Sequence, residues 1–284
     1  MSPWNRWDLH PSVVIGLVLL GGLYVYLGGL RAPRRHIASF VGALVVVFLA
    51  LNGPLHNLSD NYLFSAHMAQ HLLLTLVFPP LLLYGCPAQV VRPLLRPRWV
   101  MAVGRVVTRP LAAASLFTAP IVIWHVPVLY EAALRNHNLH ILQHLVFLAT
   151  ALIMWWPVLS PVPELPRIPH LLQMLYLFLL GIPMSVTGAL ITLSNSVLYP
   201  FYAAAPRVGG GGLSPLDDQQ IGGLLMWVLG GLMLWIVMTV IWFRYSVWDQ
   251  RGDAEAKVPA EAYGQGTGDS GLGTRRDQAQ APSP

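Results

Sequence analysis

Charged side chains are scarce in this sequence. Only 10% of the 284 residues are Asp, Glu, Lys or Arg, whereas 55% are hydrophobic and the mean hydropathy is +0.56. A soluble domain of this length needs far more surface charge, so the composition predicts an integral membrane protein with the lipid bilayer as its solvent. The net charge of +5 does not indicate a nucleic-acid partner, because the basic residues lie in loops between apolar runs, where they set membrane orientation.

Cysteine is almost absent as well. Cys86 is the only one in the sequence, which excludes an intramolecular disulfide and any metal site built from several cysteines. No catalytic nucleophile motif, phosphate-binding loop or nucleotide-binding motif is recognisable in the sequence. We therefore do not expect an enzyme.

Long hydrophobic runs, by contrast, are frequent. A helix needs about 20 apolar residues to cross a bilayer, and residues 1–248 contain seven candidate segments. These are residues 12–30, 37–54, 62–84, 110–130, 139–159, 170–193 and 220–243. The pattern predicts an all-α fold, an integral membrane bundle of seven transmembrane helices. Residues 249–284 are rich in Gly, Ala, Pro and charge and cannot bury an apolar core, so we expect them to form a disordered cytoplasmic tail.

The distribution of Lys and Arg predicts the orientation of the chain. If the N-terminus lies outside, fourteen of the 17 basic residues fall in the inner loops and the tail, and only Arg6, Arg135 and Arg207 fall outside. The positive-inside rule then places the N-terminus outside and the C-terminus in the cytoplasm. With this topology, eight of the ten histidines lie toward the outer side, and only His36 and His170 lie near the inner face.

Four of the outer histidines form two pairs with the same spacing, in "HMAQH" and "HILQH". Side chains four residues apart share one face of a helix, with their Cβ atoms about 6 Å apart, so His67 with His71, and His140 with His144, can each chelate a metal ion. A lone membrane histidine is more often a hydrogen-bond partner between helices. Two such pairs, together with His125 at a similar depth, favour a functional metal site.

The ligand types indicate which metal this site would hold. Imidazole suits copper or zinc, and a methionine thioether suits Cu(I). The predicted ligands are His67, Met68, His71, His125, His140 and His144. Further candidate ligands or access residues are His56, His137, Asp217, Asp218 and Met226. The ordinary role of the two aspartates is to cap the N-terminus of the last predicted helix.

Three other functions stay open at this point. A b-type haem could take axial histidines from two helices, although doubled histidines at four-residue spacing favour direct chelation. A copper transporter predicts polar or soft residues along a path to the inner face, where the predicted spans have few. In an assembly scaffold without metal, the histidines would only hold helices together.

Several sequence blocks resemble a known family. "HMAQHLLL", "FPPLLLYGCP", "WHVPVLYEAAL" and "LDDQQIGGLLMW" are similar to the signature blocks of the multi-spanning CtaG-type cytochrome c oxidase assembly factors, over most of residues 50–243. The resemblance implies a bacterial plasma-membrane protein that helps to assemble a haem–copper oxidase through copper delivery. Its partners would be oxidase subunits and, as a further candidate, a periplasmic copper donor. By position, the matching motif residues are His67, Met68, His71, Trp124, His125, Tyr130, His140, His144, Asp218, Gln219 and Met226.

Overall fold

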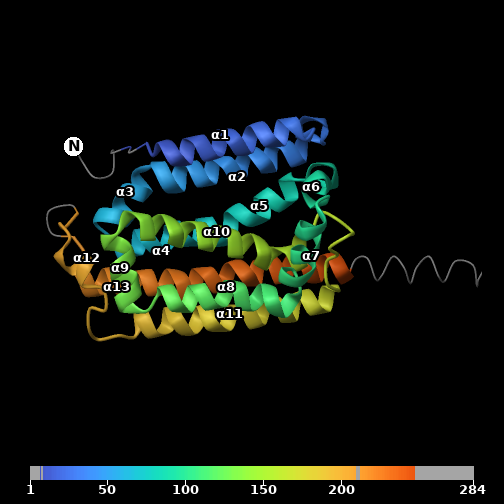
Figure 1. Cartoon of the computed structure of the whole chain (residues 1–284). Coiled ribbons are helices and arrows are strands. Elements are labelled where there is room, and N and C mark those ends of the chain that lie inside the picture. Colours follow the sequence, from blue (N-terminus) through green and yellow to red (C-terminus); the bar gives the residue numbers. More distant parts are fainter. Residues whose placement is uncertain (1–6, 8, 209–211, 247–284) are drawn as a thin grey trace, which may run out of the picture. The chain divides into compact units, whose positions relative to one another are not determined.

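The regular secondary structure of the described chain is helical. The computed structural model describes residues 7, 9–208 and 212–246, and every regular element in these ranges is a helix (Figure 1). The chain divides into two compact units, Met1–Thr239 and Val240–Pro284; of the second unit, residues 240–246 are described and are helical. The predicted tail, residues 249–284, lies outside the described residues. The all-α prediction is confirmed for the part that is described.

Five helices within the described residues are long and apolar enough to cross a membrane, which makes this a multi-pass membrane protein. They are α2 (Arg34–Asn52), Phe64–Gly85, α10 (His137–Leu159), α11 (His170–Thr192) and Pro215–Ser246. Two of them contain a π-helical turn. The segments of these two are α4 (Phe64–Leu72), η3 (Leu73–Val77) and α5 (Phe78–Gly85) in the first, and α13 (Pro215–Leu224) followed by η4 (Leu225–Leu229) in the second.

The two remaining predicted spans fall on shorter helices. α7 (Arg98–Val107) and α8 (Pro110–Trp124) together form a sixth candidate, but they are bent by 78° relative to one another. α1 (Pro11–Tyr26) has 16 residues, fewer than the roughly 20 that a straight span requires. Each predicted segment therefore overlaps a helix, while the number of seven spans and their orientation in the membrane stay predictions.

Short helices connect the longer ones. They are η2 (Gly29–Arg31), α3 (Pro54–Asn61), α6 (Ala88–Leu95), α9 (Pro127–Arg135) and α12 (Pro200–Ala204). The turn between α1 and α2 lies at the same end of the first unit as α6 and α7, whereas α3, α9 and α12 lie at the opposite end (Figure 1). The connections that the sequence predicts to be cytoplasmic therefore gather at one end, and the predicted outer connections gather at the other.

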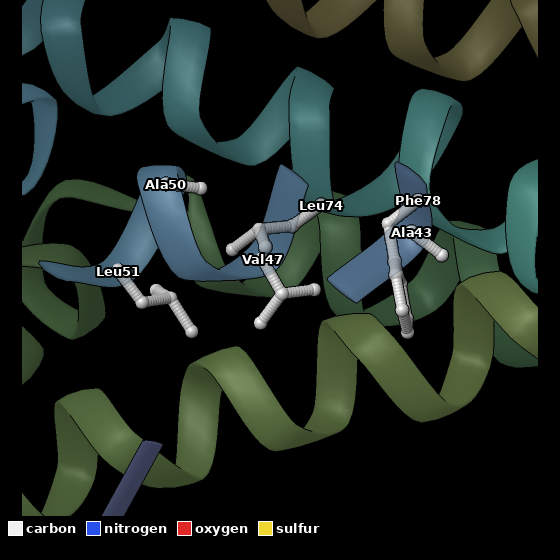
Figure 2. Close-up of a cluster of buried hydrophobic side chains, with 6 residues drawn as sticks. All are labelled: Ala43, Val47, Ala50, Leu51, Leu74 and Phe78. Atoms are coloured by element: carbon white, nitrogen blue, oxygen red, sulfur yellow. The ribbon is translucent and has the colours of Figure 1, made fainter. Parts of the chain in front are cut away.

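A buried apolar cluster joins α2 to the helix that carries the first histidine pair. It consists of Ala43, Val47, Ala50 and Leu51 of α2 with Leu74 and Phe78 (Figure 2). The alanines let the helices approach closely, and α1 and α10 cover the cluster with Val13, Leu17, Leu148 and Leu152. Because lipid tails are as apolar as these side chains, close packing holds such helices together, and hydrophobic transfer contributes little.

Proline explains the π-helical turn η3. Pro79 has no backbone N–H, so the carbonyl of Thr75 loses its ordinary donor four residues later. The indole N–H of Trp155, on α10, donates to this carbonyl at 2.9 Å, and the Thr75 hydroxyl donates to the carbonyl of His71 at 2.7 Å. These hydrogen bonds therefore connect the turn to α10 one helical turn after His71. π-helical turns of this kind frequently occur at functional sites.

Proline also ends α8 earlier than the hydropathy predicted. The expected span covered residues 110–130, but α8 ends at Trp124. Pro127 excludes the helical region for the residue before it, and Val126 accordingly adopts φ −63° and ψ 125°. His125 is thereby the C-terminal cap residue of α8, and its side chain is buried.

Candidate metal centre

Five histidines meet at the end of the first unit where α3, α9 and α12 lie. His67 and His71 come from α4, His140 and His144 from α10, and His125 from the end of α8, and all are buried, with exposed fractions between 0% and 8%. The ring centroids lie 4.2 Å apart within the first pair and 4.4 Å within the second. Between the pairs, His67 lies 5.4 Å from His140, and His71 lies 5.5 Å from His144 and 6.4 Å from His125. We call these five residues the histidine cluster.

The Nε2 atoms of the whole histidine cluster are buried and have no hydrogen-bond partner among the described residues. Leaving a buried polar atom unpaired costs about 1–3 kcal/mol, so five such atoms at one place are unusual for a purely structural cluster. One ring nitrogen from each of His67, His140 and His144 lies within 4.8 Å of the other two. Around a tetrahedral ion, nitrogens at about 2.1 Å from the metal lie about 3.4 Å apart, so small ring rotations would complete a three-nitrogen site.

Hydrogen bonds set the tautomers of two of these rings. Tyr202 donates its hydroxyl proton to the carbonyl of Ser59 at 2.7 Å, so its oxygen accepts from Nδ1–H of His67 at 3.0 Å. His125 donates Nδ1–H to the carbonyl of Ile121 at 2.6 Å. In a neutral imidazole the other nitrogen then carries the lone pair. Nε2 of both residues is therefore in the form that binds a metal ion.

A carboxylate lies behind a third ring. Nδ1 of His140 lies 3.6 Å from Oδ2 of Asp60, and Nε2 of His56 lies 3.4 Å from the same oxygen. The amide nitrogen of Gln70 donates to the carbonyl of Ala50 at 2.8 Å and to Nδ1 of His56 at 3.0 Å, so His56 holds its proton on Nε2, toward Asp60. A carboxylate behind a histidine is the arrangement that commonly fixes the tautomer of a metal ligand.

Asp60 and Tyr202 are functional candidates that the sequence analysis missed. Asp60 follows His56 by four residues, the same one-face spacing as in the histidine pairs, and this signal could have identified it. Tyr202 lies 135 residues from His67, and nothing local marks it. Burial raises the pKa of the Asp60 carboxyl, and the nearby His56, Ser59, His10 and His137 draw that pKa back down.

The predicted role of Asp218 is corrected by the structure. The hydroxyl of Ser214 caps α13 by accepting from the backbone N–H of Asp217 at 3.1 Å, and Asp217 is exposed. Asp218 instead reaches across to α4, whose N-terminus it caps by accepting from the backbone N–H groups of Phe64 at 2.7 Å and Ser65 at 3.2 Å. Because Phe64 precedes His67 by three residues, this carboxylate helps to position the first histidine pair.

The other predicted site residues occupy different surroundings. Met68 is buried and faces α13, where a Cβ atom at Gly222 would lie 3.2 Å from its Cγ. Met226 is buried in η4. His137 is exposed at the first turn of α10. Their roles as ligands or access residues stay predictions.

A cleft of about 370 Å³ leads to the histidine cluster between α1, α2 and α10. Its polar residues are His10, Ser12, His56, Asp60, His137, His140 and His144. The remainder of its lining is largely aliphatic, with Val13, Leu17, Val47, Leu145 and Leu148. The cleft therefore connects exposed His137 with buried members of the cluster.

Comparison with known proteins identifies the family. Residues 3–246 match the cytochrome c oxidase caa3 assembly factor family (Caa3_CtaG). The chain belongs to this family. The resemblance seen in the sequence blocks is thus confirmed over nearly all of the described residues.

Relatives of this caa3 assembly factor family member are found in mycobacteria. An uncharacterized protein of Mycobacterium leprae (strain TN) is 27% identical over 271 residues, which cover 86% of this chain and 40% of that protein. Uncharacterized proteins of Mycobacterium bovis and Mycobacterium tuberculosis are each 27% identical over 264 residues, 83% of this chain and 38% of theirs. The chain therefore spans about two fifths of the length of these relatives. No solved structure matches the chain.

Three further residues of the family motifs lie around the histidine cluster but are not part of it. The ring of Tyr130 packs 5.3 Å from His67. Gln219 accepts from the backbone N–H of Leu198 at 2.6 Å and donates to the carbonyl of Ser196 at 3.1 Å, which fastens the loop before α12. Trp124 ends α8 beside His125. The family motifs thus gather around one buried group of imidazoles, the histidine cluster.

Proposed function

We propose that this protein helps to assemble a haem–copper cytochrome c oxidase in the bacterial plasma membrane by holding copper on the histidine cluster and passing it to an oxidase subunit. Membership of the caa3 assembly factor family supports the assembly role. The observation that carries the copper step is the set of five buried Nε2 atoms without a partner among the described residues. Copper is the cargo in this proposal, and the oxidase subunit is its acceptor.

The chemistry of the donors supports the choice of metal. Neutral imidazole suits copper and zinc, whereas Mg²⁺ and Ca²⁺ prefer oxygen ligands. The carboxylate of Asp60 lies behind Nδ1 of His140. Copper is preferred over zinc because the client of the family is a copper-containing oxidase.

The number of donors supports delivery over permanent storage. A tetrahedral ion takes four ligands, and the cluster offers five Nε2 atoms. One imidazole can therefore replace another as the ion moves, so no step leaves it without protein ligands. The cleft beside His137, His140 and His144 would admit the ion from the outer side, where a periplasmic copper donor could supply it.

Copper analysis of the full chain, purified without a histidine tag, tests this proposal. We expect His71→Ala and His144→Ala each to lower copper affinity about tenfold or more, and to reduce oxidase maturation in cells at normal protein level. The control is His36→Ala, on α2 at the opposite end of the unit, which should change neither quantity. If both cluster variants keep the wild-type copper stoichiometry and affinity, the copper proposal fails, and an assembly scaffold without metal takes its place.

A further inference from the structure

Helix α7 has the composition and placement of a helix that lies in a membrane interface. None of its side chains is fully buried, and it crosses the direction of α8 at 78° (Figure 1). Because α8 is an apolar helix directed through the bundle, a helix nearly perpendicular to it would run along the membrane surface. Amphipathic helices in such positions place their apolar face among the lipids.

The two faces of α7 differ in kind. Trp99, Val103 and Val106 follow the spacing i, i+4, i+7, so they share one face, and they are 71%, 53% and 55% exposed. Arg98 and Arg105 lie seven residues apart on a neighbouring face, which turns toward α6. Tryptophan at such a position is typical of the boundary between lipid and water.

The basic face of α7 forms a pocket with α6. The pocket has a volume of about 600 Å³ and is lined by Arg92, Leu95, Arg96, Arg98, Met101, Ala102, Arg105 and Glu164. Glu164 pairs with Arg92 at 2.8 Å. Arg96, Arg98 and Arg105 have no ion-pair partner among the described residues. Three guanidinium groups that are unpaired within the described part of the chain therefore line one pocket beside an exposed apolar stripe.

We propose that the α6–α7 pocket binds the headgroup phosphate of an anionic phospholipid, whose acyl chains lie along Trp99, Val103 and Val106. Guanidinium binds phosphate oxygens with two parallel N–H donors, and basic pockets beside membrane helices are known to take anionic headgroups. The adjoining apolar stripe distinguishes a lipid from a free phosphate ion, because a free ion makes no use of it. This site lies on residues other than the histidine cluster and does not depend on copper binding.

Native mass spectrometry of the full chain in a neutral detergent tests the site, with phosphatidylglycerol, phosphatidylcholine and inorganic phosphate as separate probes. We expect phosphatidylglycerol to bind tighter than phosphatidylcholine. The double variant Arg98→Gln/Arg105→Gln should weaken phosphatidylglycerol binding about thirtyfold, and Arg98→Gln alone about fivefold. The matched control is Arg34→Gln/Arg35→Gln, which removes two exposed charges at the same end but outside the pocket, and it should change binding less than twofold.

Two results would overturn the proposal. Equal losses in both double variants would show that general surface charge, and no built site, attracts the lipid. Binding of inorganic phosphate that displaces phosphatidylglycerol at similar concentration would show a free-anion site in which the apolar stripe plays no part. Because Arg98 and Arg105 are exposed, the variants should fold as the wild type does, and the single variant gives the answer if the double variant is poorly expressed.

Discussion

Replacing Asp218 by alanine should unfold the first turn of α4 and disturb the histidine cluster from a distance. The carboxylate is fully buried and accepts from the backbone N–H groups of Phe64 and Ser65 and from the Ser65 hydroxyl. The change leaves two N–H groups without an acceptor, at about 1–3 kcal/mol each, and removes a negative charge from the positive end of a helix. We expect the free energy of unfolding to fall by about 3 kcal/mol in total.

This fall in stability should be measurable as a lower Tm for thermal unfolding in detergent. For a chain of this size, 1 kcal/mol shifts the Tm by about 2–4 °C, so Asp218→Ala should lower it by about 6–12 °C. Asp218→Asn keeps one acceptor oxygen and should cost about half as much. Because Phe64 precedes His67 by one helical turn, copper affinity should fall in parallel with stability.

The neighbouring residue provides the control. Asp217→Ala removes an exposed carboxylate one position away, which accepts a hydrogen bond from the Ser214 hydroxyl, and it should change the free energy of unfolding by less than about 0.5 kcal/mol. If Asp218→Ala unfolds within 1 °C of the wild type, the capping of α4 by α13 contributes nothing, and the link from Asp218 to the histidine cluster is wrong.

Three further predictions follow from single features. Burial raises the pKa of the Cys86 thiol from 9.0 to about 11. Because the thiolate is the reactive form, alkylation of Cys86 should accelerate about tenfold per pH unit between pH 8 and 10, and a rate that levels off near pH 9 would contradict this. The stability that the buried neutral thiol contributes should be complete below pH 9 and be lost toward pH 11. Trp155→Phe removes the hydrogen bond to the Thr75 carbonyl and should cost about 1–2 kcal/mol in detergent unfolding, whereas Trp235→Phe, on a 58% exposed side chain, should change little. A reporter fused to the C-terminus should be active only in the cytoplasm, and a periplasmic signal would reverse the predicted orientation.

Much of the site could be predicted from the sequence because its signals are local. The pairs His67 with His71 and His140 with His144 follow from helical spacing, and the long apolar runs predict the helices that carry them. The two helices run in the same direction, so the pairs lie at one depth, and the packing of the bundle brings their ring centroids to 5.4–5.5 Å from one another. Local spacing therefore predicts the two histidine pairs, whereas their meeting depends on how the helices pack.

The remaining features depend on contacts between distant parts of the chain. Asp218 was expected to cap its own helix, but its partners Phe64 and Ser65 lie about 150 residues earlier. The bond from His67 to Tyr202 spans 135 residues. The end of α8 at Trp124, by contrast, was signalled locally by Pro127, and an average of hydropathy along the segment conceals such a signal.

X-ray absorption at the copper edge tests the central claim most directly, on the full chain loaded with Cu(I) and purified without a histidine tag. If the histidine cluster binds copper, the first shell should contain imidazole nitrogens at about 2.0–2.1 Å, with the outer-shell scattering of imidazole rings. The number of these nitrogens should fall in His67→Ala and His140→Ala. Copper without imidazole scattering, or a spectrum unchanged in both variants, would contradict the account.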